Sequence, residues 1–318
     1  MTANANFFLS LQKGIKSANA NPCIEGPDFP LLSYNELEAL TAQAANLLKS
    51  LNIKAGGRVL VQTPKSPLGV AFYLACLRSG VIYVPLNIAY TTEELDYFIE
   101  DTEPDLFVCD PAKREALEDL FSKYNIPSIL EMDTFGQGSL LDQLQEFQKQ
   151  HEVVQVDGGD IAVILYTSGT TGKPKGAMLS HHNLNSNSQI LFKIWGWKND
   201  DVLIHALPIF HIHGLFVALH LSLLGGTSML FLSGFDPKQV IQLIPQATVL
   251  MGVPTFYTRL LQQGSLNPKL CKNMRLFVSG SAPLLEETFS DFAERSGQRI
   301  LERYGMSETG MLTSNPLD

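Results

Sequence analysis

Short apolar runs alternate with amphipathic segments along most of this chain of 318 residues. The runs, such as Arg58–Gln62 and Ile161–Tyr166, have the length and composition of buried strands, and glycine or proline turns separate them from the segments that follow. The segments between them, such as Tyr34–Leu51 and Leu68–Arg78, carry apolar residues at helical spacing. Because this alternation is typical of parallel sheets covered by helices, we expect an α/β protein with mostly parallel, helix-covered sheets.

The same pattern continues to the end of the chain, with one polar interruption. Further strands are expected at Val81–Pro85, Asp105–Cys109, Val202–Ala206, Ser228–Leu232, Thr248–Gly252, Arg275–Ser279 and Arg299–Glu302, and further helices at Thr92–Glu100 and Ala112–Lys123. The polar connector at residues 148–159 divides the pattern. We therefore expect two α/β subdomains, residues 1–155 and residues 156–318.

Charge and cysteine usage exclude several classes of protein. The formal net charge is −9 and no run of lysine or arginine stands out, so neither a nucleic acid nor an anionic membrane is an expected partner. The four cysteines are far apart and form no zinc-ligand pattern. No stretch approaches the roughly 20 apolar residues of a membrane span, and the first residues do not resemble a secretory leader. A cytoplasmic protein is expected.

One glycine-rich stretch, LYTSGTTGKPKGAM at Leu165–Met178, directly follows an expected strand. Its glycines let the backbone approach a ligand, its hydroxyl groups and successive N–H groups suit an anion, and its lysines supply positive charge. A Walker A loop needs GxxxxGK[ST], whereas here Lys173 follows GxxG and precedes Pro174, which offers neither a hydroxyl nor an N–H. The stretch predicts a phosphate site of another kind, with a flexible linker as the alternative.

The longer stretch YTSGTTGKPKGAMLSH resembles the signature of adenylate-forming enzymes, which include acyl-CoA synthetases, luciferases and peptide-synthetase adenylation domains. Three further stretches follow in that family's order: HALPIFHIHGLF (205–216), VSGSAPL (278–284) and LERYGMSETG (301–310). The resemblance implies the large N-terminal domain of the adenylate-forming fold. It also implies ATP, Mg²⁺ and coenzyme A: an acid attacks the α-phosphorus of ATP, pyrophosphate leaves, and a thiol displaces AMP from the acyl-adenylate.

The resemblance also assigns roles to residues of the four stretches. His211, Lys175 and Glu308 would be catalytic, with His211 between the acyl carboxylate and the phosphate, whereas His213 is expected to be structural. Glu308 and Thr167 would hold the metal, the alternative for Glu308 being an ordinary acid at a helix start. The ATP phosphates would be bound by Thr167, Ser168, Gly169, Thr170, Thr171, Gly172, Lys175 and Ser307, and the adenine by Ala282, Pro283, Tyr304 and Gly305.

Arg303 suggests which acid is used. It occupies a place that is often small in relatives that take bulky acids, and a guanidinium there can bind a second carboxylate. The acyl site implied by the resemblance comprises His211, Gly280, Ser281, Arg303 and Met306. Stretches such as VPLNIAYTTEELDYFIEDTEPDLFVCDPAKR (84–114) and ATVLMGVPTFYTRLL (247–261) resemble malonyl-CoA synthetases. We expect malonate or a close dicarboxylate as substrate; a structural ion pair is the alternative role for Arg303.

Relatives continue well beyond the YGMSETG motif, so the C-terminal lid domain and the β-barrel part are expected to be missing from these 318 residues. The chain alone is then expected to be weak or inactive as a ligase, because exclusion of water and orientation of the reactants would both suffer. Two other functions stay open: a non-catalytic protein that binds ATP or an acyl-adenylate, and an adenylation domain that loads a carrier protein. The sequence leaves the oligomeric state and the choice between malonate and methylmalonate open.

Overall fold

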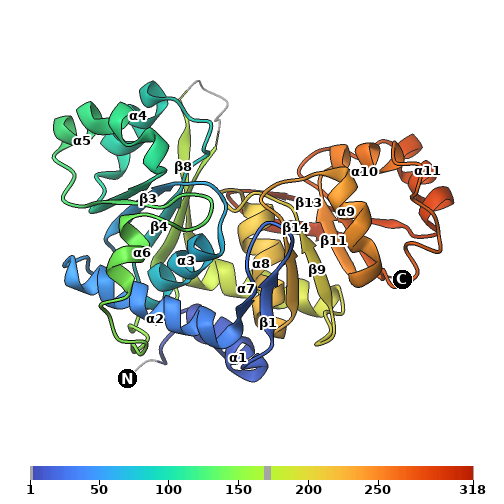
Figure 1. The fold of residues 1–318 in the computed structure, drawn as a ribbon, viewed down its shortest axis with the longest axis horizontal. Coiled ribbons are helices and arrows are strands. Elements are labelled where there is room, and N and C mark those ends of the chain that lie inside the picture. Colours follow the sequence, from blue (N-terminus) through green and yellow to red (C-terminus); the bar gives the residue numbers. More distant parts are fainter. Residues whose placement is uncertain (1–2, 168–172, 318) are drawn as a thin grey trace. The chain divides into compact units, whose positions relative to one another are not determined.

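The structure, a computed structural model, describes residues 3–167 and 173–317. Residues 1–12 and 35–185 form one compact unit, and residues 13–34 and 186–318 form a second (Figure 1). This division differs from the one expected at residue 155. Strands β7 (Ile161–Thr167) and β8 (Lys175–Ser180) follow the polar connector, yet they complete the sheet of the first unit.

The first unit is built on a six-stranded sheet with the order β6-β5-β3-β4-β7-β8. All of its neighbouring strands are parallel except β7 and β8, which are antiparallel. Its other strands are β3 (Arg58–Gln62), β4 (Ile82–Pro85), β5 (Leu106–Cys109) and β6 (Ile129–Glu131). Its helices are α2 (Tyr34–Ser50), α3 (Pro67–Ser79), α4 (Thr92–Thr102), η1 (Pro111–Lys113), η2 (Glu115–Leu117), α5 (Glu118–Tyr124) and α6 (Ser139–Leu144), while α1 (Phe8–Ala18) and α7 (His181–Ile194) cross the division.

Both faces of this sheet are buried. Leu60 and Phe107 belong to a core shared with α4 and α5, and their neighbours Val59 and Val108 are also fully buried. Side chains of successive strand residues point to opposite faces, so the sheet needs cover on both sides. The runs RVLVQ and LFVC are therefore almost continuously apolar, as parallel strands in such a position must be.

Local signals fix the ends of the helices in this unit. The Ser66 hydroxyl accepts a hydrogen bond from the backbone N–H of Gly69 at the start of α3, and Gly80 ends the helix in the left-handed conformation with φ 66°. At α4, Thr91 and Glu94 form a capping box. These caps satisfy backbone groups that the helix itself leaves without partners.

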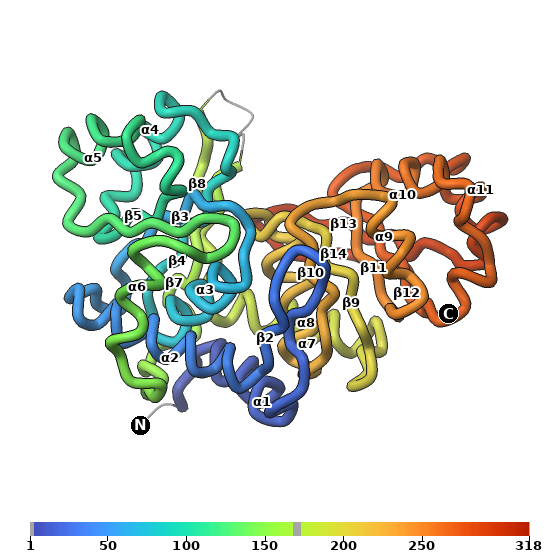
Figure 2. The backbone as a smooth tube through the Cα atoms, in the orientation of Figure 1, coloured from blue at the N-terminus to red at the C-terminus, as the bar shows by residue number. Residues whose placement is uncertain are grey.

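The second unit is built on an eight-stranded sheet with the order β14-β13-β12-β11-β9-β10-β1-β2, whose inner pairs are parallel and whose two outermost pairs are antiparallel (Figure 2). Its strands are β1 (Pro22–Glu25), β2 (Leu32–Ser33), β9 (Val202–His205), β10 (Ser228–Phe231), β11 (Val249–Gly252), β12 (Leu276–Ser279), β13 (Ile300–Met306) and β14 (Gly310–Ser314). Its helices are η3 (His213–Ala218), which is a π-helix, α8 (Leu219–Gly225), α9 (Pro237–Leu243), η4 (Ile244–Gln246), α10 (Pro254–Leu261) and α11 (Glu286–Ser296).

An aromatic cluster forms the core between this sheet and α10 and α11. The rings of Tyr257, Phe277 and Phe292 pack edge to face, with centroids 4.9–6.4 Å apart. The Tyr257 hydroxyl donates to the carbonyl of Val278 at 2.6 Å, which satisfies its one buried polar group. This packing fixes β12 and the beginning of the loop that follows it.

The expected fold class is confirmed, and most expected strands appear within one or two residues of their predicted ends. Among the expected helices, the segment Ala112–Lys123 differs from the prediction, because it forms η1, η2 and α5 rather than one helix. Strand β13 is longer than expected and runs on to Met306, because β14 pairs with its second half. The extension places Arg303 and Tyr304 on a strand rather than in a loop.

Replacing His181 with asparagine is expected to make stability less sensitive to acid. His181 is fully buried, its Nδ1 accepts from the backbone N–H of Phe7 at 3.2 Å, and burial lowers its pKa to about 4. The unfolded chain, with a histidine pKa near 6.5, therefore binds more protons between pH 6.5 and 4. Stability through this group is present above that window and falls as the pH falls, by about 2 kcal/mol at pH 5.

Urea unfolding of the wild type and the His181→Asn variant at pH 7 and pH 5 measures this difference. The exposed neighbour His182 provides the matched control, since His182→Asn should lose stability with acid as the wild type does. Equal acid sensitivity of both variants would contradict the assignment.

Candidate active site

The predicted phosphate loop begins at the carboxyl end of β7 and ends at the beginning of β8. Thr167 pairs directly with Lys175 across these two strands, so the loop leaves and re-enters the sheet at one point. The predicted site residues Ser168, Gly169, Thr170, Thr171 and Gly172 lie outside the described residues. The Lys175 side chain is exposed, and that of Thr167 is half-buried.

Aromatic residues support the base of this loop. The Tyr97 hydroxyl donates to the carbonyl of Pro174 at 2.9 Å, and the ammonium of Lys173 lies 5.5 Å from the centre of the Tyr97 ring. Phe98 packs on Tyr166 with a centroid distance of 4.4 Å. Helix α4 thus anchors both ends of the loop through tyrosine contacts that the sequence motif did not reveal.

A second group of predicted residues lines a cavity of about 410 Å³ within the second unit. Four segments meet there: the loops after β9, β11 and β12, and the end of β13. These are carboxyl ends of neighbouring parallel strands, where ligand sites of such sheets occur. The lining residues are Leu207, Pro208, His211, Ile212, His213, Gly214, Val253, Ser281, Arg303, Gly305, Met306 and Ser307. Four of the five predicted acyl-site residues are among them, and Gly280 is the exception.

Arg303 is the dominant charged group of this cavity. Only 4% of the residue is exposed, and its Nη2 lies 3.4 Å from the Ser281 hydroxyl. Its Nε is buried without a hydrogen-bond partner, and no carboxylate pairs with it among the described residues. Burial lowers the pKa of Arg303 to about 10, while nearby Tyr257 acts in the opposite direction. A cationic guanidinium in this setting is an anion site with unused donors.

The backbone directly after β12 makes room for this guanidinium. A Cβ at Gly280 would lie 2.6 Å from Nη1 of Arg303, so the guanidinium packs directly on the glycine backbone. Ser281 has a φ of 71°, which is costly for a residue other than glycine. That conformation accompanies the contact between the Ser281 hydroxyl and Arg303.

Two histidines approach the same cavity at different depths. His211 is exposed and lies with its ring 4.5 Å from that of Phe210, and desolvation lowers its pKa. His213 is 3% exposed, and neither of its ring nitrogens has a partner in the described structure. Burial, then the charge of Arg303, then His205 lower the pKa of His213, so it is neutral at pH 7. Sequence reasoning gave His213 a structural role; the structure places it in the cavity lining, with unused hydrogen-bonding groups.

The residues predicted to bind adenine and metal surround the turn between β13 and β14 and the loop after β12. Tyr304 is 58% exposed, and Ala282 and Pro283 are exposed as well. Glu308 is exposed in the turn, and Ser307 is half-buried beside the cavity. Within the described residues, no group of three or more His, Cys, Asp or Glu side chains could hold a metal ion by themselves. Thr167 belongs to the first unit, so its joint role with Glu308 stays a prediction.

Replacing Asn187 with alanine is expected to destabilise the second unit by about 1–3 kcal/mol, because two backbone groups of β14 lose their partner. The Asn187 side chain donates to the carbonyl of Met311 at 2.9 Å and accepts from its N–H at 3.1 Å, which fixes β14 beside β13. Urea unfolding measures the loss. Gln189→Ala, at an exposed position on the same helix, should leave stability unchanged; equal losses in both would contradict the assigned role.

Comparison with known proteins shows the family to which the chain belongs. Residues 19–318 match the family described as AMP-binding enzyme. The chain belongs to this family. Among AMP-binding relatives, it is 34% identical over 277 residues to the mitochondrial malonate–CoA ligase ACSF3 of Xenopus laevis, covering 82% of this chain and 47% of that protein. It is 32% identical over 287 residues to a malonate–CoA ligase of Arabidopsis thaliana, covering 82% of this chain and 46% of that one. The chain spans about half the length of these relatives.

Solved structures of AMP-binding proteins confirm the fold. The ATP-bound crystal structure of MatB from Rhodopseudomonas palustris matches 99% of this chain and 62% of its own, with a TM-score of 0.95 and 48% identity. An anthranilate CoA ligase, AuaEII, has a TM-score of 0.89 at 21% identity, which shows the fold alone. The chain therefore has the fold of the N-terminal domain of adenylate-forming enzymes. Among the described residues, no helix is both long and apolar enough to span a membrane.

Proposed function

We propose that this chain functions in an ATP-dependent acid–thiol ligase that activates malonate, or a close dicarboxylate, and transfers it to coenzyme A. The observation that carries this proposal is the buried guanidinium of Arg303, which has no carboxylate partner among the described residues. A monocarboxylate would leave that charge without a counter-ion, whereas the second carboxylate of malonate would supply one. The names of the relatives, malonate–CoA ligases and MatB, agree with this reading.

In the proposed reaction, one malonate carboxylate is held by Arg303 and Ser281 while the other attacks the α-phosphorus of ATP. His211, an exposed residue of the cavity lining, would lie between the attacking carboxylate and the phosphate, and its neutral imidazole has one N–H to donate to either of them. The phosphate loop with Lys175 would stabilise pyrophosphate as it departs, because positive charge and N–H donors offset the developing negative charge. Water exclusion around Arg303 strengthens its attraction for the dianion.

Magnesium fits the residues that are present, although it is a proposal for this chain. Mg²⁺ is commonly bound through one or two carboxylates together with phosphate oxygens, and Glu308 offers one exposed carboxylate beside Ser307. Glu308 and Thr167 would hold the ion, which would neutralise phosphate charge.

We also propose a cytoplasmic location and coenzyme A as the thiol acceptor. The relatives include a mitochondrial protein.

Malonate-dependent exchange between ATP and pyrophosphate tests the proposal. The chain is assayed alone and joined to the C-terminal part of MatB, with acetate and benzoate as comparison acids. Exchange that depends on malonate in the joined protein supports the proposal, and little exchange in the chain alone agrees with a need for the second part. Equal exchange with acetate or benzoate would contradict the substrate. ATP binding without exchange in the joined protein would favour a non-catalytic binding protein, and product formation on a carrier protein but not on coenzyme A would change the acceptor.

A further inference from the structure

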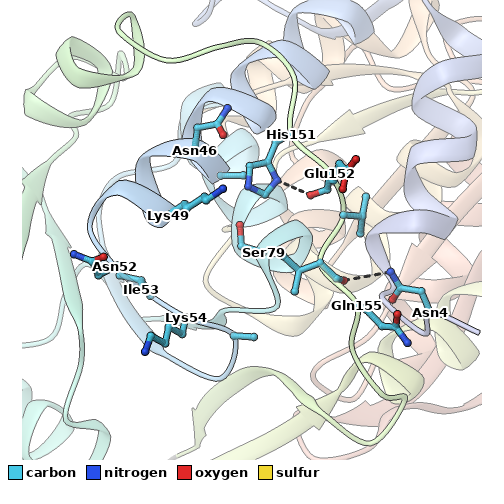
Figure 3. A pocket seen from close by; sticks show the side chains of 14 residues that line it. Asn4, Asn46, Lys49, Asn52, Ile53, Lys54, Ser79, His151, Glu152 and Gln155 are labelled. Carbon is cyan, nitrogen blue, oxygen red and sulfur yellow. Dashed lines mark hydrogen bonds between the residues drawn. The ribbon is translucent and has the colours of Figure 1, made fainter. Parts of the chain in front are cut away.

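A second, larger cavity lies entirely within the first unit, away from the predicted phosphate loop. It measures about 880 Å³ and is lined by α2, the loop between α2 and β3, the end of α3, and the connector at residues 151–155 (Figure 3). The loop precedes β3, and α3 precedes β4, so the cavity lies at the amino ends of these strands. The phosphate loop follows the carboxyl end of β7, which is parallel to β4. The two sites are therefore at opposite edges of one sheet.

The walls of this cavity are held by specific hydrogen bonds. The Asn46 side chain donates to the carbonyls of Gln148 and Gln150 at 2.9 and 3.0 Å, and Asn4 donates to the carbonyl of Val154 at 3.3 Å. The guanidinium of Arg78 donates to the carbonyl of His151 and pairs with Glu38 at 3.0 Å. The connector is thus tied to α2 and α3, and the cavity has defined walls although the connector contains no helix or strand.

Three polar side chains in the cavity have capacity for a ligand. The Ser79 hydroxyl is buried and has no hydrogen-bond partner among the described residues, and the residue is only 8% exposed. Lys49 is exposed and forms no ion pair among the described residues. Burial first, and then the charges of Arg78 and Lys49, lower the pKa of the His151 imidazole. In Figure 3 the Lys49 ammonium points toward His151, and the Glu152 carboxylate points away from it. His151 donates its Nδ1–H to the Glu152 carbonyl, so Nε2 can donate to an anion when the ring is protonated.

The charge of the cavity selects the kind of ligand. Lys49 and Lys54 both line it, whereas Glu152 is the one acidic residue among the described residues of the lining. Apolar groups, among them Ile53, line the remainder. An ammonium, a hydroxyl and an imidazole that is protonated when the anion binds suit the several acceptor oxygens of a phosphate group. The volume leaves room for an organic part next to it.

We propose that this cavity is a second anion site, which binds a small phosphate-bearing molecule through Lys49, His151 and Ser79. The site is independent of the proposed ligase reaction, because it shares no residue with the cavity around Arg303 or with the phosphate loop. A ligand there would join α2, α3 and the connector, and would stabilise the unit that carries the phosphate loop.

Site-resolved NMR tests this proposal without an activity assay. The chain is labelled with ¹⁵N-histidine, the His151 signal is assigned with a His151→Gln variant, and inorganic phosphate or phenyl phosphate is titrated. The expected result is a saturable shift of the His151 signal, with tighter binding of phenyl phosphate because the apolar lining contacts its ring. Lys49→Gln should weaken binding about tenfold or more, and Ser79→Ala about two- to tenfold.

Matched variants separate this site from other phosphate binding. Lys193→Gln removes an exposed lysine from the other unit, and Lys175→Gln removes a charge from the phosphate loop; neither should change the His151 response. Ser79→Ala deletes a hydroxyl without a partner, so the variant should fold with an unchanged or higher Tm. A His151 shift that does not saturate, or that is the same in Lys49→Gln and Ser79→Ala as in the wild type, would overturn the proposal.

Discussion

Replacing Arg303 with alanine is expected to lower the affinity of the chain for malonate by about 30- to 1000-fold. Truncating one partner of a buried charge pair costs about 2–4 kcal/mol, and each 1.4 kcal/mol is tenfold in affinity. Calorimetric titration of malonate into the purified chain measures the change directly. Because Arg303 has no carboxylate partner among the described residues, the same substitution removes an uncompensated buried charge, and stability should be nearly maintained.

A loss of malonate affinity without a loss of stability distinguishes a substrate-binding arginine from a structural one. Truncating an arginine that is held in an ion pair would lower the stability of the protein. The Arg303→Ala variant should instead bind malonate less tightly, with little change in Tm. Arg259→Ala provides the control, since Arg259 is exposed and packs on Phe235 in the same unit. If Arg303→Ala binds malonate as tightly as the wild type does, Arg303 is not the group that recognises the second carboxylate.

The strands were predictable because each one has a simple physical signature. The runs RVLVQ and LFVC are buried on both faces, so they lack the polar alternation that would have left their ends ambiguous. The site motifs follow strand ends, so their placement at the carboxyl edge of a parallel sheet followed from the topology. Arg303 and Ser281 could be joined in advance only through the family resemblance, since they lie 22 positions apart.

Features that depend on distant contacts were not predictable. Helix α1 is fixed by burial of Phe8 and Leu11 and by the hydrogen bond from Phe7 to His181, 174 positions away. Strand β14 became recognisable only as the partner of β13, which Asn187 holds in place from α7. Each of these contacts brings together segments far apart in sequence, and local periodicity carries no information about such a partner.

Replacing Gly280 with alanine is expected to lower malonate affinity at least tenfold through displacement of Arg303. The φ of Gly280 is not positive, so the backbone itself accepts alanine. The new methyl group would lie 2.6 Å from Nη1 of Arg303, and the atoms it meets belong to the movable end of a side chain. The guanidinium must therefore leave its position beside Ser281, at a cost in stability of about 1–3 kcal/mol for the overpacked site. Malonate titration and urea unfolding measure the two effects.

A double-mutant cycle isolates the contact between Gly280 and Arg303. When Arg303 is already alanine, the methyl group at position 280 meets no guanidinium, so Gly280→Ala should change neither malonate affinity nor stability much further. The two substitutions should then be strongly non-additive, with a coupling of about 0.5–3 kcal/mol. Additive effects would show that Gly280 acts through another part of the cavity. Non-additivity would mean that the absence of a Cβ at Gly280, directly after β12, sets the position of the Arg303 guanidinium, because the guanidinium packs against the glycine backbone.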